Sequence, residues 1–325
     1  MDLSIIPENP APPGAVVSAI ATRDHKGLRV ARWSCGDVCA GTVAILPGRA
    51  EFIEKYFEVV AELLRRNFDV VVLDWRGQGL SSRLVDNPRK GHVDNFRAYD
   101  TDLDALAEQV LEPFCRRPWF GLCHSMGAAI ALAAAHAGRL PFERLVLTVP
   151  MIDIYGLRFK RSLRALAKLF VVLGFGRRFV PGGGPSPYMS SNFEGNILTS
   201  DPKHLARWTA ILDAAPDLAI GDPTIGWLNA AFQLMRRFED VEYPRRILTP
   251  ILIVAAGDDR LVDTPATELF ASRLKAGKCI ILAHSRHEIL MERDRYRELF
   301  WAAFDGFLPG EHAAGDNVVV AETVG

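Results

Sequence analysis

The stretch GLCHSMGAA, residues 121–129, decides how this 325-residue chain is interpreted. It overlaps the apolar run PWFGLC and continues into the small-residue run AAIALAAAHAG, which is typical of a closely packed helix. A strand, a sharp turn and a helix in this order would lift the Ser125 hydroxyl above the carboxyl edge of a sheet. The alternative is that Ser125 only caps the helix. The choice depends on what else that sheet edge carries.

Short apolar runs alternate with amphipathic stretches along the chain. The runs predicted to be strands span 41–47, 69–75, 118–123, 144–150, 249–257 and 278–284. The stretches predicted to be helices between the first of these span 51–66, 95–111 and 126–137. Runs that are apolar nearly throughout are typical of strands buried on both faces by crossover helices. The pattern predicts an α/β fold with a mostly parallel, doubly wound sheet.

The alternation lapses over residues 151–245, where helical periodicity surrounds a GGGP segment at 182–185. So long a connection needs structure of its own, and it predicts a helical cap inserted into the core. The core is then expected to consist of residues 16–150 and 246–308. The proline-rich residues 1–15 and the tail 309–325 have the composition of weakly ordered ends.

Two later strands are followed by candidate partners for Ser125. A serine nucleophile needs a base, and the base needs an acid that holds its tautomer. Asp259 follows the strand 249–257, and His287 follows the strand 278–284. Because three loop ends agree in residue type, chain order and topology, we predict a triad of Ser125, Asp259 and His287. The alternatives are Asp258 or Asp263 as the acid and His284 as the base.

A carbonyl attacked by Ser125 becomes an oxyanion, which needs two preorganised donors. The backbone N–H of Met126, at the start of the helix, is expected to supply one. We assign the other to the N–H of Arg49, in the turn that follows the strand 41–47.

These motifs resemble serine α/β-hydrolases of the lysophospholipase and monoacylglycerol lipase branch, which are S33-type hydrolases. The matching segments are PGRAEFIEKY, LDWRGQGLSS, GHVDNFRAYDTDL, CHSMG, GDDRLVD and RHEIL, within residues 28–308. The resemblance implies the α/β-hydrolase fold and hydrolysis of carboxylic esters of single-chain lipids, a lysophospholipid or a monoacylglycerol. Two positions depart from the family pattern: Pro47 replaces a histidine of the oxyanion turn, and Cys123 replaces the first glycine of the elbow.

Other functions remain open on the same residues. The triad would serve an esterase for short-chain or aromatic esters, or an aminopeptidase-like amidase, because the fold does not determine the bond that is cleaved. A protein that only binds ligands could also keep the fold. The intact triad argues against that reading. We expect no cofactor and no metal.

Composition bounds the partners and the compartment. A formal net charge of −1 provides no field for nucleic acid, and the five cysteines include no CxxC pair, which suits a reducing cytoplasm. No apolar run approaches the ~20 residues that span a bilayer. The segment 157–180 is basic and amphipathic, with no acidic residue between Asp153 and Glu194. It favours, as a secondary expectation, peripheral contact with the inner face of a membrane; the alternative is that its apolar face packs over the site.

Overall fold

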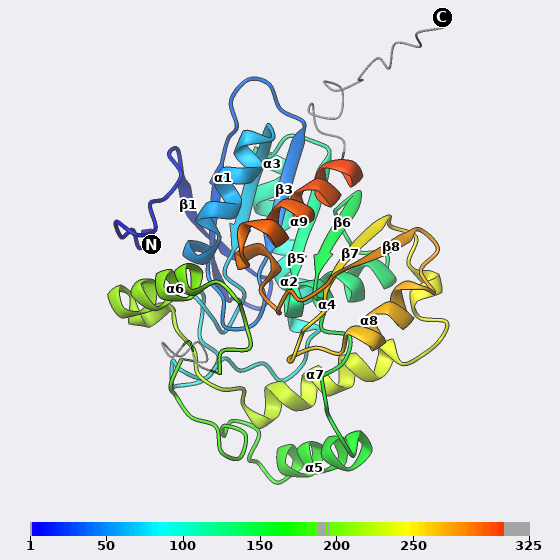
Figure 1. Ribbon diagram of the computed structural model, residues 1–325. Coiled ribbons are helices and arrows are strands. Elements are labelled where there is room, and N and C mark those ends of the chain that lie inside the picture. The colour runs from blue at the N-terminus through cyan, green and yellow to red at the C-terminus, as the bar shows by residue number, and fades with distance from the viewer. Residues whose placement is uncertain (1, 188–192, 194, 309–325) are drawn as a thin grey trace, which may run out of the picture.

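The computed structural model describes residues 2–187, 193 and 195–308. Within these residues, eight strands form one sheet in the order β1-β2-β4-β3-β5-β6-β7-β8 (Figure 1). The strands are β1 Val16–Ala21, β2 Gly27–Trp33, β3 Gly41–Leu46, β4 Phe68–Leu73, β5 Trp119–His124, β6 Arg144–Thr148, β7 Ile251–Ala256 and β8 Gly277–Leu282. The pairs β1–β2 and β2–β4 are antiparallel and the others are parallel. The predicted doubly wound, mostly parallel sheet is thereby confirmed.

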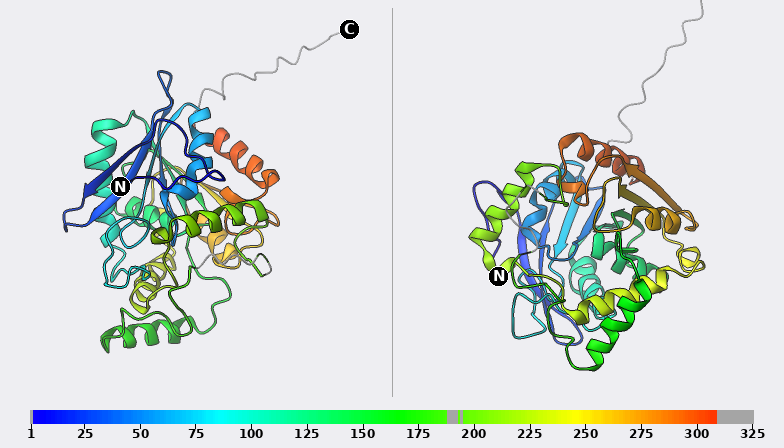
Figure 2. Two further views of the ribbon diagram at one scale, coloured as in Figure 1. Left: turned by 90° about the vertical axis from the view of Figure 1, so that its left-hand side faces the viewer. Right: turned by 60° about the horizontal axis from the view of Figure 1, so that its bottom comes forward.

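Helices cover both faces of the sheet. The α-helices are α1 Phe57–Arg65, α2 Ala98–Leu106, α3 Glu112–Phe114, α4 Ser125–His136, α5 Lys160–Val172, α6 Pro202–Ala214, α7 Ile225–Phe238, α8 Thr264–Ala271 and α9 Asp294–Phe307. The 3₁₀-helical segments are η1 Ile53–Tyr56, η3 Pro216–Leu218, η4 Pro244–Arg246 and η5 Ile289–Met291, and η2 Ala107–Leu111 is a π-helical turn. Helices α1 and α9 lie together on one face, and α2 and α4 lie on the other (Figures 1 and 2).

Burial along the central strands follows from their composition. Every residue of β3, β4, β5 and β7 is buried, as expected for apolar strands covered on both faces. Helix α4 packs closely because nine of its twelve residues, mostly alanine, are buried. Strand β8 differs, since it stands at the end of the sheet and leaves Ile281 42% exposed. Its apolar sequence does not distinguish an edge position from a central one.

The first two strands were not predicted from the sequence. Strand β1 is an edge strand whose residues are mostly exposed or half-buried, so its sequence VVSAIA lacks the continuous burial of the central strands. The preceding segment contacts the core although its proline-rich composition did not indicate this. The Trp33 indole donates to the Pro12 carbonyl at 3.0 Å, and the Asn9 amide donates to the Glu54 carbonyl at 2.8 Å.

The residues between β6 and β7, expected to form a cap over 151–245, contain α5, α6 and α7 and no strand within their described part. These three helices lie at one end of the sheet (Figure 1). Helix α5 is packed mainly on α7 and lies at the outer rim of the molecule (Figure 2). The expected tail, 309–325, lies outside the described residues. None of the described helices is long and apolar enough to cross a bilayer.

Candidate active site

The backbone turns sharply between β5 and α4. His124 ends the strand and Ser125 begins the helix. The backbone φ of Ser125 is 48°, a left-handed conformation that residues other than glycine rarely adopt. Gly127 makes the turn possible, because a Cβ there would lie 2.2 Å from the Leu46 carbonyl oxygen and 2.5 Å from that of Pro47. This strand–turn–helix geometry presents the serine hydroxyl at the carboxyl edge of the sheet.

The three residues of the predicted triad lie in hydrogen-bonding contact. His287 Nε2 is 3.0 Å from Ser125 Oγ, and His287 Nδ1 is 2.8 Å from Asp259 Oδ2. The second carboxylate oxygen of Asp259 accepts the backbone N–H groups of Leu261, at 2.8 Å, and Val262, at 3.0 Å. These two bonds hold the carboxylate in the orientation that meets the imidazole.

The alternative acids and base lie elsewhere. Asp258 and His284 form a loose pair at 3.7 Å, and their side chains are 59% and 82% exposed. Asp263 caps α8 by accepting the N–H of Ala266 at 2.8 Å. In the described part of the chain, none of the three forms a hydrogen bond or ion pair with Ser125 or His287.

Electrostatics couple the buried acid and base. Burial alone would raise the pKa of Asp259, but the attraction of His287 and its hydrogen bonds hold that pKa below its ordinary value. Burial alone would lower the pKa of His287, and the Asp259 carboxylate, followed by the charges of Glu288 and Glu51, raises it above 6.5. His287 must be neutral to accept a proton from serine, so its raised pKa makes it a stronger base that loses function as the pH falls.

The turn expected to hold the oxyanion is fixed by three side chains. The Trp75 indole donates to the Pro47 carbonyl at 2.8 Å. The Gln78 amide donates to the Gly48 carbonyl at 2.7 Å, and Glu51 Oε2 accepts the N–H of Gly48. Both departures from the family pattern lie at or next to this turn. The Pro47 carbonyl accepts the hydrogen bond from the Trp75 indole, and the Cys123 side chain is fully buried in strand β5.

A cavity of about 210 Å³ opens at the Ser125 hydroxyl. Its lining joins the oxyanion turn, Ser125 and His287 to apolar side chains from both the core and α7. The apolar lining residues are Met151, Ile154, Leu198, Trp227, Leu228, Leu261 and Val262. A cavity of this volume is smaller than pockets that enclose whole drug-sized ligands, so a long acyl chain would extend beyond it.

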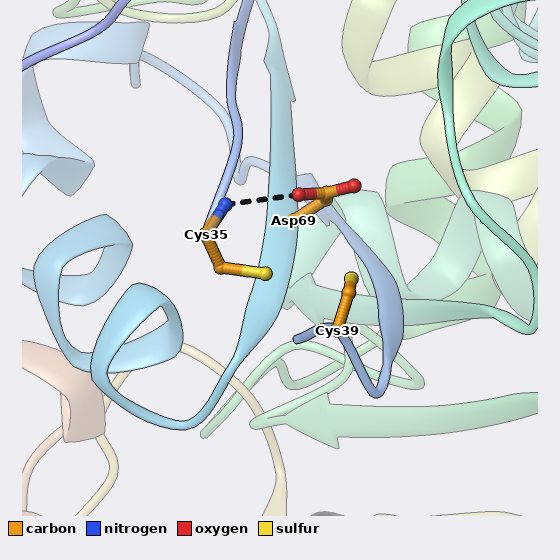
Figure 3. Close-up of side chains that lie close together, drawn as sticks. All are labelled: Cys35, Cys39 and Asp69. Atoms are coloured by element: carbon orange, nitrogen blue, oxygen red, sulfur yellow. Dashed lines mark hydrogen bonds between the residues drawn. The ribbon is translucent and has the colours of Figure 1, made fainter. Parts of the chain in front are cut away.

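Two groups of side chains come close enough together to resemble metal sites. The Sγ atoms of Cys35 and Cys39 and a carboxylate oxygen of Asp69 lie within 4.8 Å of one another. Figure 3 shows the three side chains. The Asp69 carboxylate is already bonded by Arg116, at 2.7 and 2.8 Å. Burial and a hydrogen bond to Cys39 raise the pKa of Cys35 to about 12, so the thiolate that binds metal is disfavoured. These contacts do not favour a cation at this position.

The second group adjoins the triad. We call it the Lys55 cluster, and it consists of Glu51, Lys55, His124 and Glu288. The ammonium of Lys55 contacts both carboxylates and takes the place that a metal ion would occupy. Neither this cluster nor the contacts of Trp75 and Gln78 with the turn were predicted from the sequence. A signal was present, since three charged residues, Glu51, Glu54 and Lys55, alternate with apolar and aromatic residues in the buried stretch EFIEKYF.

Comparisons with known proteins match most of the chain. The family model described as serine aminopeptidase, S33, matches residues 38–294. A probable lysophospholipase L2 of Haemophilus influenzae is 31% identical over 266 residues, which cover 81% of this chain and 82% of that protein. Lysophospholipase L2 of Escherichia coli K12 is 28% identical over 288 residues, which cover 85% and 82%.

Solved structures show the same fold. A soluble variant of monoglyceride lipase from Saccharomyces cerevisiae, in complex with a substrate analogue, superposes with a TM-score of 0.68 and 17% identity, covering 90% of this chain and 96% of that chain. A thermostable carboxyl esterase from Bacillus coagulans gives a TM-score of 0.70 and 18% identity, covering 91% and 99%. The α/β-hydrolase fold implied by the sequence motifs is confirmed.

Proposed function

Given that the chain belongs to the serine aminopeptidase S33 family, we propose that it hydrolyses the carboxylic ester of a single-chain lipid through an acyl-enzyme. The observation that carries this proposal is the continuous contact from Asp259 through His287 to the Ser125 hydroxyl. Carboxylic ester hydrolysis is supported by the lysophospholipase relatives. A lysophospholipid or a monoacylglycerol is the substrate that we favour.

In this mechanism His287 takes the proton of Ser125 while the hydroxyl attacks the ester carbonyl. Asp259 holds the imidazole in the required tautomer and stabilises the imidazolium. The backbone N–H groups of Arg49 and Met126 stabilise the oxyanion, and losing one such donor typically costs about 3 kcal/mol. His287 then protonates the leaving alcohol, and water repeats the sequence to release the acid.

The cavity favours an ester with an apolar acyl group over a peptide. Its apolar lining suits a hydrocarbon chain, whereas an aminopeptidase needs an acidic group to bind the substrate amine. Two carboxylates, Glu51 and Glu288, do lie at the cavity, but both are bonded to Lys55. An aminopeptidase-like amidase and an esterase for short-chain or aromatic esters are therefore less well supported.

The substrate proposal predicts a ranking of rates. The purified protein should hydrolyse lysophosphatidylcholine and monoacylglycerol with a higher kcat/KM than short p-nitrophenyl esters, and an aminoacyl anilide should be the poorest substrate. A series of esters of graded acyl length tests the acyl-pocket argument directly. A preference for the anilide, or rates that do not depend on acyl length, would contradict the lipid assignment.

We further propose that this protein is cytoplasmic and contacts the inner face of a membrane through α5. One face of this helix is apolar and exposed: Leu163, Leu166 and Leu169, spaced three residues apart, are 37%, 46% and 52% exposed. Exposed basic side chains stand at its two ends, Arg158 at one and Arg177 and Arg178 at the other, while Arg161 and Lys168 line the groove toward α7. An apolar face bordered by basic residues suits the surface of an anionic bilayer. Lipid substrate in the bilayer would then lie close to α7, which contributes Trp227 and Leu228 to the cavity lining.

The double variant Arg158→Gln/Arg177→Gln is expected to bind anionic vesicles more weakly. Each basic residue near an anionic surface contributes about 1 kcal/mol, so two should weaken binding roughly 30-fold. Co-sedimentation with phosphatidylglycerol-containing vesicles measures this, with phosphatidylcholine vesicles for comparison. The matched control, Lys275→Gln/Arg295→Gln, removes the same charge outside residues 157–180. Binding that ignores anionic lipid, or equal losses in the control, would contradict the contact.

A further inference from the structure

The Lys55 cluster joins three segments that the proposed mechanism uses. Glu51 belongs to the oxyanion turn and Lys55 to η1, which follows it. His124 directly precedes Ser125, and Glu288 directly follows His287. All four members of the cluster are buried, with exposed fractions of 6% or less. Burying charges is costly, and such a group is weak evidence for stability by itself, which raises the question of what it positions.

The ammonium of Lys55 lies at the centre of the cluster. It donates to Glu51 Oε1 and, at 2.8 Å, to Glu288 Oε2. It also lies 4.4 Å from the centre of the Trp208 ring on α6, a cation–π contact from the helical insertion. One cation therefore links the residue at the end of the oxyanion turn to the residue next to His287.

On one side the cluster holds the oxyanion turn. Glu51 Oε2 accepts the N–H of Gly48 and the hydroxyl of Tyr56, the latter at 2.5 Å. A Cβ on Gly48 would lie 2.9 Å from the Glu51 carboxylate and 2.9 Å from the His124 ring, so the turn packs directly on the cluster. Glu51 thereby fixes the Pro47–Gly48 peptide, and Gln78 holds the carbonyl of the next peptide, whose N–H is the proposed Arg49 donor.

On the other side the cluster meets the imidazoles. The rings of His124 and His287 pack edge to face, with centres 5.0 Å apart. His124 Nδ1 lies 2.9 Å from the Thr148 hydroxyl, while its Nε2 faces Glu51 at 3.5 Å and Glu288 at 3.4 Å. Burial lowers the pKa of His124 to about 3, so this ring stays neutral and packs beside His287 without adding charge.

We infer that Glu51, Lys55 and Glu288 are positioning residues, with Lys55 tying the oxyanion turn to the loop that carries His287. The inference rests on the proposed acyl-enzyme function. The tie keeps the oxyanion donor and the base at fixed places while charge develops on the substrate. Misplacement of either group by about 1 Å would cost on the order of 10²-fold in rate.

The variant Lys55→Met removes the ammonium and keeps the length of the side chain. We expect kcat to fall on the order of 10²-fold, because the turn and the histidine loop lose their common anchor. KM for a p-nitrophenyl ester should change little, since the apolar side chains that bind the acyl group are untouched. A folded Lys55→Met protein with the kcat of the wild type would overturn the inference.

The variant Glu288→Gln decides the question if Lys55→Met does not fold. Its amide keeps an oxygen for Lys55 and a similar volume, but it loses a charge that helps to raise the pKa of His287. The acid limb of the kcat/KM profile should therefore move to lower pH, a shift that a loss of stability alone would not cause. The ionisable groups that act on His287 are Asp259, Glu288, Glu51 and His124, and Lys55 contacts both glutamates. An unmoved limb with unchanged kcat would overturn the inference.

A matched control is Asp102→Asn. Asp102 is fully buried and paired with Arg76 at 2.7 Å, so its loss also disturbs a buried ion pair. It should lower stability and leave both kcat and the acid limb in place. Labelling of Ser125 by a fluorophosphonate separates this inference from the substrate proposal. If the wild type labels but leaves lipid esters intact, only the substrate proposal fails, and the labelling rate replaces kcat in the comparison.

Discussion

Ser125→Ala is expected to reduce ester hydrolysis by about 10⁶-fold, the scale seen when a nucleophile is removed from a serine triad. No other hydroxyl meets His287 Nε2 among the contacts of the described residues, so no neighbour can take over the attack. A residual rate above that of water would come from the oxyanion donors and from substrate binding alone. The measurement is kcat for a soluble ester, with active-site titration to exclude contaminating enzyme.

Covalent labelling provides the control for this prediction. The wild type should form one fluorophosphonate adduct, located at Ser125 by peptide mapping, and Ser125→Ala should form none. The variant should melt within a few degrees of the wild type, because only one oxygen is lost from a half-buried site. An adduct at another residue, or activity that survives in the variant, would contradict the nucleophile assignment. A ligand-binding protein without catalysis would show neither adduct nor turnover.

Asp259→Asn is expected to lower kcat by about 10⁴-fold while the fold persists. The amide is isosteric, and its oxygen can still accept the N–H groups of Leu261 and Val262. Its NH₂ group would then face His287 Nδ1 as a donor, which favours the wrong tautomer of the imidazole. The pKa of His287 should fall as well, because the carboxylate that raises it is gone. A pH profile of kcat/KM measures both effects.

The neighbouring carboxylates are matched controls. Asp258→Asn changes an exposed side chain one position away and should leave kcat unchanged. Asp263→Asn alters the cap of α8; asparagine is a comparable cap, so stability should change little. A loss in either control as large as that of Asp259→Asn would show that the acid had been assigned to the wrong residue.

Much of the core could be predicted because its central strands are mostly apolar and buried along their whole length. Strands such as FDVVVL are buried throughout, so composition alone identifies them. The carboxyl ends of parallel strands meet at one sheet edge, which is why Asp259 and His287 could be placed near Ser125 without coordinates. Strand β1 escaped prediction because most of it is exposed or half-buried, and β2 because two arginines interrupt its apolar run GLRVARW.

The Lys55 cluster could not be predicted for a different reason. Its contacting pair Lys55 and Glu288 is separated by 233 residues, and sequence alone does not say which buried charges meet. The same holds for Trp75 and Gln78, whose role depends on a contact with the turn after β3. Whether the apolar face of α5 is buried or exposed could not be predicted either, because an amphipathic helix has the same sequence pattern in both cases.

The close approach at Gly127 restricts how this enzyme can be redesigned. Even alanine would place its methyl carbon 2.2 Å from the Leu46 carbonyl oxygen, so the helix or the end of β3 would have to give way. Ser125 and the proposed oxyanion turn are thus packed together and must move together. Directed evolution aimed at new leaving groups should leave that packing intact and vary the α7 wall of the cavity, where substitutions reshape the substrate space without moving the reacting atoms.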